Sequence, residues 1–289
     1  MPASDAGPGT LYVVATPIGN LGDVTLRALE TMRSVPLIAA EDTRITRRLL
    51  ARYEIPTHAI SYHARSGPSR LAELLAHLRG GADLALVSDA GTPVVSDPGS
   101  DLVAAWAGEG GRVVPIPGAS SVLAAVSASG VAGPRWSFEG FLPRSGRERK
   151  ERLARLAADD RATVIFEAPT RLAATLRDLA TACGADRAAA VCRELTKMHE
   201  QIARGALGEL AMAAADGSIP ARGEVVLVVR GVDPAAGPVP GGEARPLAAS
   251  LDDGRARVQA LVGDGVPRSE AARRVASETG LSRRELYRA

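Results

Sequence analysis

The first 130 residues alternate short runs of apolar and β-branched residues with stretches of helical periodicity, and this alternation is the strongest constraint on the fold. Strands are expected at Leu11–Ala15, Leu37–Ala40, His58–Ser61, Leu84–Ser88 and Val113–Ile116. Helices are expected at Thr25–Arg33, Thr43–Tyr53, Ser69–Arg79, Pro98–Gly108 and Ser120–Ser129. Strand and helix in alternation predict an α/β lobe with a mostly parallel sheet that is covered on both faces.

The rest of the chain predicts a second, smaller α/β lobe and a helical appendage. The turn-forming run Gly130–Arg135 predicts a boundary, so that the lobes would span 11–133 and 134–230, after a loose tail at 1–10. Residues 231–247 contain four Gly and four Pro and read as a linker. Residues 248–289 have the outline of a helix-turn-helix, in which a helix that begins at Pro267 is broken at Thr279–Leu281 and followed by a last helix at Ser282–Arg288. In the second lobe, strands are expected at Thr163–Phe166, Ala188–Val191 and Val225–Val229, and helices at 147–158, 170–182 and 205–215.

Composition excludes several classes of protein. Hydrophobic residues make up 46% and charged residues 24% of the chain, which is typical of a globular protein rather than a disordered or fibrous one. No apolar run reaches the roughly 18 residues of a membrane helix, and the first ten residues do not resemble a signal peptide. Cys183 and Cys192 lack the spacing of a metal site or a disulfide framework, which favours a reducing cytoplasm and predicts no bound metal.

Three loops follow expected strands and are rich in turn-forming residues. Ala15–Asp23 matches neither the dinucleotide-binding nor the P-loop motif, and by itself it could be an ordinary turn. Ser88–Gly99 is long for a simple connection, and Asp89 stands where its strand ends. Pro115–Ser121 opens a helix whose free N–H groups could hold polar ligand atoms. Because the carboxyl ends of parallel strands meet at one edge, the three loops are expected to line one crevice.

Several blocks of sequence resemble the tetrapyrrole-methylase-like S-adenosylmethionine methyltransferases. The resemblance runs from about residue 11 to 230 and implies a two-lobed fold, a cofactor bound in the cleft between the lobes, and a homodimer. It is similar in most detail to the members that methylate ribosomal RNA, which implies 2′-O-methylation of a cytidine in the decoding region of 16S rRNA within the 30S subunit. The blocks are Leu11–Asp23, Glu41–Arg44, Ser88–Gly99, Pro117–Ser121, Phe138–Pro143, Phe166–Arg171, Cys192–Lys197 and Gly223–Val226.

The same resemblance implies which residues border S-adenosylmethionine. Both lobes would contribute, with polar groups for the ribose and amino-acid ends and apolar walls around the adenine. The implied residues are Thr16, Pro17, Ile18, Asp89, Ala90, Gly91, Thr92, Pro93, Ser120 and Ser121 from the first lobe, and Phe166, Leu195, Pro220 and Gly223 from the second.

Candidate substrate contacts come from two groups of charged residues. Glu41, Asp42 and Arg44 open a helix after the second strand, and Arg144, Arg147 and Lys150 lie near the Phe138–Pro143 block. Basic side chains at such places can hold RNA phosphates, although charged residues on a helix also often do no more than face solvent.

The chemistry requires a group that takes the proton of the ribose hydroxyl. Lys197 is our candidate, because it is one of only two lysines in a chain with 33 arginines and a desolvated lysine can act as a base. Glu41 and Asp42 are the alternatives, and a surface salt bridge is the competing interpretation of Lys197.

Two other functions stay open at this stage. One is a methylase of the same fold that acts on a corrin or a protein. The other is a non-catalytic ribosome-assembly factor that retains the cofactor pocket only as structure.

Overall fold

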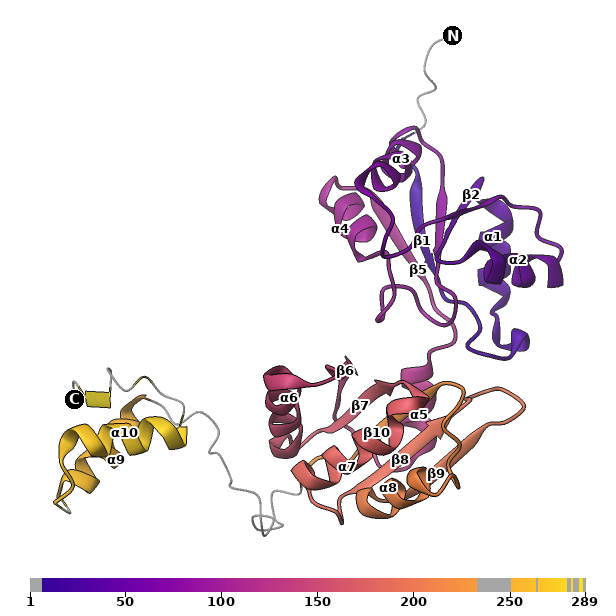
Figure 1. The fold of residues 1–289 in the computed structure, drawn as a ribbon. Coiled ribbons are helices and arrows are strands. Elements are labelled where there is room, and N and C mark those ends of the chain that lie inside the picture. Colours follow the sequence, from indigo (N-terminus) through magenta and orange to yellow (C-terminus); the bar gives the residue numbers. More distant parts are fainter. Residues whose placement is uncertain (1–6, 233–250, 264, 280–281, 283–285, 288–289) are drawn as a thin grey trace.

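The computed structural model describes residues 7–232, 251–263, 265–279, 282, 286 and 287, and these form two α/β lobes and a separate helical pair (Figure 1). The first six residues of the predicted tail, residues 233–247 of the predicted linker and most of the last predicted helix lie outside the described residues.

The first lobe contains a five-stranded sheet in the order β3-β2-β4-β1-β5. All its neighbouring strands are parallel, which confirms the topology expected from the sequence. The connection after β1 leads to β2, toward one edge of the sheet, whereas the connection after β4 leads to β5, toward the other edge. The loops after β1 and β4 therefore diverge, and open parallel sheets bind ligands at such a point. The strands are β1 (Thr10–Val14), β2 (Leu37–Ala40), β3 (Ala59–Ser61), β4 (Leu84–Val87) and β5 (Arg112–Ile116).

Helices cover both faces of this sheet, as expected. Helices α1 (Leu26–Ser34) and α2 (Thr43–Arg52) pack on one face around Met32. Helices α3 (Pro68–Arg79) and α4 (Ser100–Gly108) pack on the other. A short 3₁₀ turn, η1 (Leu21–Asp23), precedes α1.

The second lobe contains a mixed sheet in the order β6-β7-β10-β8-β9. Strand β7 is parallel to β6, and the remaining neighbours are antiparallel. Strand β6 was not predicted because a glycine and a bulge interrupt its pattern. Strand β9 was not predicted because it contains polar residues and its last two residues fall in the helix expected at 205–215. The strands are β6 (Trp136–Phe141), β7 (Ala162–Glu167), β8 (Ala188–Arg193), β9 (Gln201–Ala206) and β10 (Val225–Val229).

One face of the second sheet carries α6 (Gly146–Ala158), α7 (Leu172–Cys183) and α8 (Leu207–Ala215). The opposite face packs against α5 (Ser121–Ser129), whose Val122 and Ala125 lie among side chains of β7, β8 and β10. The division at residue 133 stays a prediction, and it would assign α5 to the first lobe although α5 contacts the second sheet. A second 3₁₀ turn, η2 (Pro169–Arg171), leads into α7.

The C-terminal pair consists of α9 (Leu251–Gly263) and α10 (Arg268–Thr279). Its small core contains Val258, Ala271, Ala272, Val275 and Leu286. The turn expected at Thr279–Leu281 lies largely outside the described residues. None of the helices that the structure describes has the length and apolarity needed to cross a membrane.

Candidate active site

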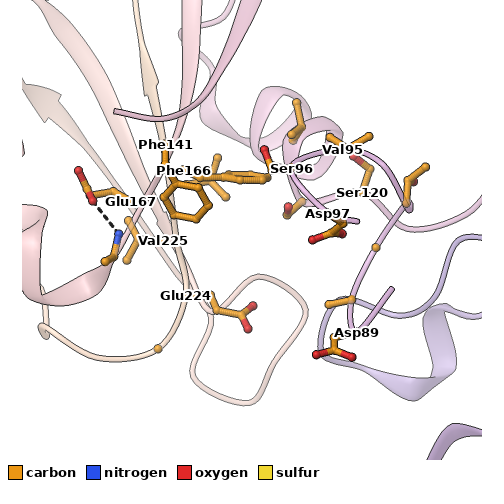
Figure 2. A pocket seen from close by; sticks show the side chains of 18 of the residues that line it. Asp89, Val95, Ser96, Asp97, Ser120, Phe141, Phe166, Glu167, Glu224 and Val225 are labelled. Carbon is orange, nitrogen blue, oxygen red and sulfur yellow. Dashed lines mark hydrogen bonds between the residues drawn. The ribbon is translucent and has the colours of Figure 1, made fainter. Parts of the chain in front are cut away.

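A cavity of about 450 Å³ lies between the lobes, at the carboxyl edge of the first sheet (Figure 2). Its first-lobe wall consists of Glu41 after β2, the loop after β4 and the start of α5. Its second-lobe wall consists of Phe141 from β6, the end of β7 and the residues around the start of β10. The lining residues are Glu41, Asp89, Ala90, Gly91, Thr92, Val95, Ser96, Asp97, Ser120, Ser121, Val122, Phe141, Phe166, Glu167, Ala168, Pro169, Gly223, Glu224, Val225 and Val226.

The loop after β1 does not line the cavity but holds the lining loop after β4 in place. Thr16 and Gly91 form an antiparallel bridge, with N···O distances of 2.8 and 3.0 Å. The Thr16 hydroxyl donates to the Ser88 carbonyl at 3.1 Å. Thr16, Pro17 and Ile18 are all buried, and none of them lines the cavity. In this structure their contacts position the loops after β1 and β4 rather than offering free polar atoms.

The loop after β4 is held in an unusual backbone conformation. Gly91 has φ +81°, and a Cβ there would lie 3.3 Å from Ile18 Cγ2. Val94 and Ser96 also have positive φ, 75° and 66°, which costs free energy for non-glycine residues. The Thr92 hydroxyl donates to the Ala119 carbonyl at 3.3 Å, so this loop is tied to the one that precedes α5. Pro93 is buried and lies outside the lining.

Three carboxylates gather on the first-lobe wall. The Asp89 Oδ1 atom accepts from the Asp42 N–H at 2.9 Å, and the Asp89 N–H donates to Glu41 Oε2 at 3.2 Å. Burial and the neighbouring Glu41 raise the pKa of Asp89. The same two causes raise the pKa of Asp97 to about 6. The wall is therefore strongly acidic and suited to a cationic or hydroxyl-bearing ligand.

The raised pKa of Asp97 predicts a pH-dependent stability. Because the folded state holds this proton more tightly than the unfolded state, the Asp97 contribution falls as pH rises from about 4 to about 6. Asp97→Asn removes that penalty and should stabilise the ligand-free protein by roughly 1 kcal/mol at pH 7.5, after allowance for solvent screening. Urea unfolding at several pH values measures the effect. The gain should shrink toward pH 4, and an Asp186→Asn control at an exposed site should show no such trend. A gain independent of pH would contradict the assignment.

The start of α5 offers backbone donors. Ser120 precedes the helix, and its hydroxyl accepts from the Leu123 N–H at 3.4 Å. Ser121 and Val122 follow and line the cavity. N–H groups in the first turn of a helix have no partner within the helix, so they can bind the carboxylate end of a ligand.

The second-lobe wall combines aromatic and apolar side chains with two glutamates, Glu167 and Glu224. Phe166 and Val226 form part of its surface. Gly223 has φ +85°, and a Cβ there would lie 2.5 Å from the Glu194 carboxylate, so both the backbone conformation and the space favour glycine. Leu195 is buried beneath the wall, and Pro220 lies outside the lining.

Lys197 lies beside the cavity without lining it. Its ammonium is 2.9 Å from Glu194 Oε1 and 3.1 Å from Glu224 Oε2. Burial acts to lower the pKa of Lys197, but the hydrogen bonds to Glu194 and Glu224 outweigh it and raise the pKa. These contacts keep the proton on Lys197, so the geometry does not favour the predicted role as a base. Its aliphatic chain lies where a Cβ on Gly19 would stand, at 2.3 Å from Cγ, and so joins the two lobes.

Of the predicted substrate residues, only Glu41 lines the cavity. Asp42 is hydrogen-bonded to Arg44, which lowers the pKa of Asp42 to about 2. Arg144, Arg147 and Lys150 are exposed near the start of α6.

Eleven lining residues were not predicted individually: Val95, Ser96, Asp97, Val122, Phe141, Glu167, Ala168, Pro169, Glu224, Val225 and Val226. All of them except Val122 occur inside blocks that the sequence had singled out, so the signal lay in those blocks rather than in the single residues. Among the described residues, no group of three or more His, Cys, Asp or Glu is arranged to hold a metal ion.

Comparisons with known proteins agree with this architecture. Residues 10–211 match the family model of Tetrapyrrole (Corrin/Porphyrin) Methylases. The chain is 49% identical over 279 residues to a ribosomal RNA small subunit methyltransferase I of Synechocystis sp., covering 96% of both chains. It is 44% identical to the protein of that name from Xylella fastidiosa, covering 97% of this chain and 98% of the relative.

A solved structure shows the same fold. The uroporphyrin-III C-methyl transferase from Thermus thermophilus complexed with S-adenyl homocysteine superposes with a TM-score of 0.57, at 20% identity, over 77% of this chain and 97% of that one. At that identity the likeness concerns the fold, whereas the near full-length relatives define the subgroup. The chain therefore belongs to the tetrapyrrole methylase family and, within it, to the group of ribosomal RNA small subunit methyltransferase I.

Proposed function

We propose that this protein transfers a methyl group from S-adenosylmethionine to the 2′-hydroxyl of a cytidine in the decoding region of 16S rRNA. The observation that carries the proposal is the near full-length similarity to relatives named for methylation of small-subunit rRNA. The interlobe cavity supports it, since it combines an acidic wall with an aromatic one.

The residues present fit S-adenosylmethionine. The cavity volume lies within the range of small-molecule sites. Asp89 would accept hydrogen bonds from the ammonium or the ribose, the first turn of α5 would donate to the carboxylate, and Phe166 and Val226 would contact the adenine. Gly91 lines the cavity, and its positive φ together with the close approach of Ile18 favours glycine at this position. When bound, this cofactor supplies a methyl group already activated by its sulfonium.

The chain must then orient the acceptor hydroxyl and take its proton. Of the three candidates from sequence, Lys197 is kept protonated and the low pKa of Asp42 makes it a weak base. Glu41 remains, and the cavity adds Asp97. A general base works best when its pKa lies near the working pH. We therefore assign the role of general base, which takes the proton of the ribose hydroxyl, to Asp97, with Glu41 as the neighbouring carboxylate.

RNA outside the target nucleotide would be held by the basic group at the start of α6. Replacing Arg144, Arg147 and Lys150 together by alanine should weaken RNA binding and make the dependence of log Kd on log salt shallower by about 2–3. Filter binding at several salt concentrations measures both. The matched control is a triple alanine variant of three exposed arginines at the amino ends of the strands of the first sheet, away from the cavity: Arg33, Arg79 and Arg112. It should leave the slope of log Kd against log salt unchanged. Equal slopes for the two triples would contradict this role.

We also propose that the acceptor is the assembled 30S particle, that the protein acts as a homodimer, and that it works in the cytoplasm, where that particle occurs. A target region built from several RNA strands is present only after assembly, and RNA recognition depends strongly on such shape.

The test is methyl transfer from labelled S-adenosylmethionine to 30S subunits from cells that lack the enzyme, with naked 16S rRNA in parallel. Label recovered as 2′-O-methylcytidine supports the proposal, and the faster acceptor decides between particle and free RNA. Cofactor binding by calorimetry without transfer to either RNA would overturn the substrate assignment in favour of a small-molecule or protein methylase.

A further inference from the structure

All three phenylalanines of the chain meet in one cluster at the cavity. The rings of Phe138 and Phe166 have centroids 4.9 Å apart at an interplanar angle of 70°. The rings of Phe141 and Phe166 are 5.6 Å apart at 61°. In a chain whose aromatic content is only 3%, this concentration singles out the second-lobe wall.

A β-bulge brings the third ring into the cluster. Side chains alternate between the faces of a strand, so residues 138 and 141 would normally point to opposite sides of the sheet. The pairing runs Phe138 to Val164 and then Gly140 to Ile165, so Glu139 is an additional residue without a partner on β7. Phe141 consequently pairs with Phe166 and shares the face of Phe138. Bulges commonly reorient a side chain next to a functional site.

The bulge also contacts the other lobe. Gly140 has φ +64°, and a Cβ at this position would lie 3.3 Å from Ser96 Oγ in the loop after β4. The bulged segment of β6 therefore meets the first lobe at the edge of the cavity.

Phe141 differs from its two partners in exposure. It leaves 53% of its surface accessible, while Phe138 and Phe166 are half-buried. It lines the cavity together with Phe166, and Figure 2 shows the two rings side by side on the second-lobe wall, across the cavity from Asp89. One face of this large apolar ring is therefore free to contact a ligand that enters the cavity.

We propose that the exposed face of Phe141 stacks on the base of the target nucleotide. The inference rests on the proposed function and adds to it how the nucleotide is held. A cavity of about 450 Å³ has room for one cofactor-sized ligand, so the base would lie where the lining is open to solvent. Phe141, 53% exposed, is the more exposed of the two aromatic side chains in the lining. Enzymes that modify nucleotides commonly take the base out of its stack, and an aromatic ring replaces the lost stacking.

The charges around Phe141 suit this orientation. The carboxylates Glu41, Asp89 and Asp97 would repel phosphates from the interior but accept hydrogen bonds from a ribose hydroxyl. Arg144, exposed three residues after Phe141, could hold a flanking phosphate outside. These contacts are mutually consistent: the base would stack on the Phe141 ring, the ribose hydroxyl would face the carboxylates, and the phosphate would stay outside the cavity.

The test compares Phe141→Leu, Phe141→Trp and wild type in methyl transfer to 30S subunits from cells that lack the enzyme. Base–aromatic stacking predicts a loss of about 10-fold or more in kcat/KM for Phe141→Leu and near wild-type activity for Phe141→Trp. Calorimetry should give cofactor Kd values within about twofold of wild type for both. Met212→Ala, which removes an exposed apolar side chain from α8 in the same lobe, should leave activity unchanged.

Each other outcome overturns a definite statement. Unchanged kcat/KM for Phe141→Leu would show that the ring does not contact the substrate. A weakened cofactor Kd with an unchanged KM for 30S subunits would assign Phe141 to the cofactor. If the wild type itself transfers no methyl to RNA, the proposed function fails and this inference fails with it, a result that the wild-type reaction identifies without any variant.

Discussion

Asp89→Asn should abolish most methyl transfer while leaving the protein folded. Of the three carboxylates on the first-lobe wall, Asp89 is the one that we place against the cofactor, and a hydrogen bond to a charged group contributes about 1.5–3 kcal/mol. Its loss should raise the Kd for S-adenosylmethionine by roughly 10- to 150-fold, and the rate at low cofactor concentration should fall by the same factor. Calorimetry and initial rates measure these two effects separately.

The asparagine is chosen because it preserves the local structure. Its side-chain oxygen can still accept from the Asp42 N–H, which lies 2.9 Å from Asp89 Oδ1. Since burial raises the pKa of Asp89, removing the charge should not lower the melting temperature. Asp83→Asn is the matched control, as Asp83 also accepts a backbone hydrogen bond, from Thr10 at 2.7 Å, but at the opposite edge of the sheet. Wild-type cofactor affinity in Asp89→Asn would refute the assignment.

The first lobe could be predicted from the sequence because strands such as β2 and β4 are continuous apolar runs that are buried on both faces. Strand β4, for example, is buried at each of its four positions. Periodicity and turn residues report such a lobe directly. The second lobe could be predicted only in part, because β6 contains a bulge and β9 is half-exposed and polar. Neither strand has the alternation by which a strand is recognised.

The candidate site divides in the same way. Motif blocks located the loops, but single residues within them have different tasks that depend on the three-dimensional fold. The polar atoms of Thr16 are hydrogen-bonded to Ser88 and Gly91, whereas Asp97, in a neighbouring loop, lines the cavity. The ion pairs of Lys197 with Glu194 and Glu224 could not be inferred either, since one partner is 27 residues away in the chain. Side-chain direction and burial decide these roles, and a sequence pattern does not contain them.

The basic residues of α6 show this contrast between two neighbouring positions. Arg147 pairs with Glu151 at the surface, and 91% of its side chain is exposed. Arg149 points inward, because residues two apart on a helix lie on nearly opposite sides. Its guanidinium donates to Asp178 at 2.9 Å, to the Thr175 hydroxyl at 3.0 Å and to the Pro143 carbonyl at 2.9 Å. Thr175 in turn donates to the buried Glu167 at 2.6 Å.

Arg149→Ala should therefore be among the most destabilising substitutions in the second lobe. Arg149 is buried but Asp178 is 46% exposed, so the main loss is the donor to Thr175 and to the Pro143 carbonyl. Leaving these acceptors without it costs about 2 kcal/mol, or roughly 4–8 °C in melting temperature for a protein of this size. Arg147→Ala, the matched control on the same helix, should change stability by less than about 0.5 kcal/mol while weakening RNA binding. Thermal unfolding of both variants, with Arg149→Lys as a partial rescue that keeps the charge, measures the difference.

The same network gives Arg149 a consequence for the site. Arg149 and Arg171 both donate to the Pro143 carbonyl, and Arg171 also donates to the Leu142 carbonyl, so the two arginines hold the chain where it leaves β6, directly after Phe141. If this anchoring positions the aromatic wall, Arg149→Ala should lower kcat/KM for 30S subunits even at temperatures where it remains folded, whereas its cofactor affinity should change little. Equal stability of Arg147→Ala and Arg149→Ala would contradict the buried network, and a stable Arg149→Ala with full activity would contradict the anchoring.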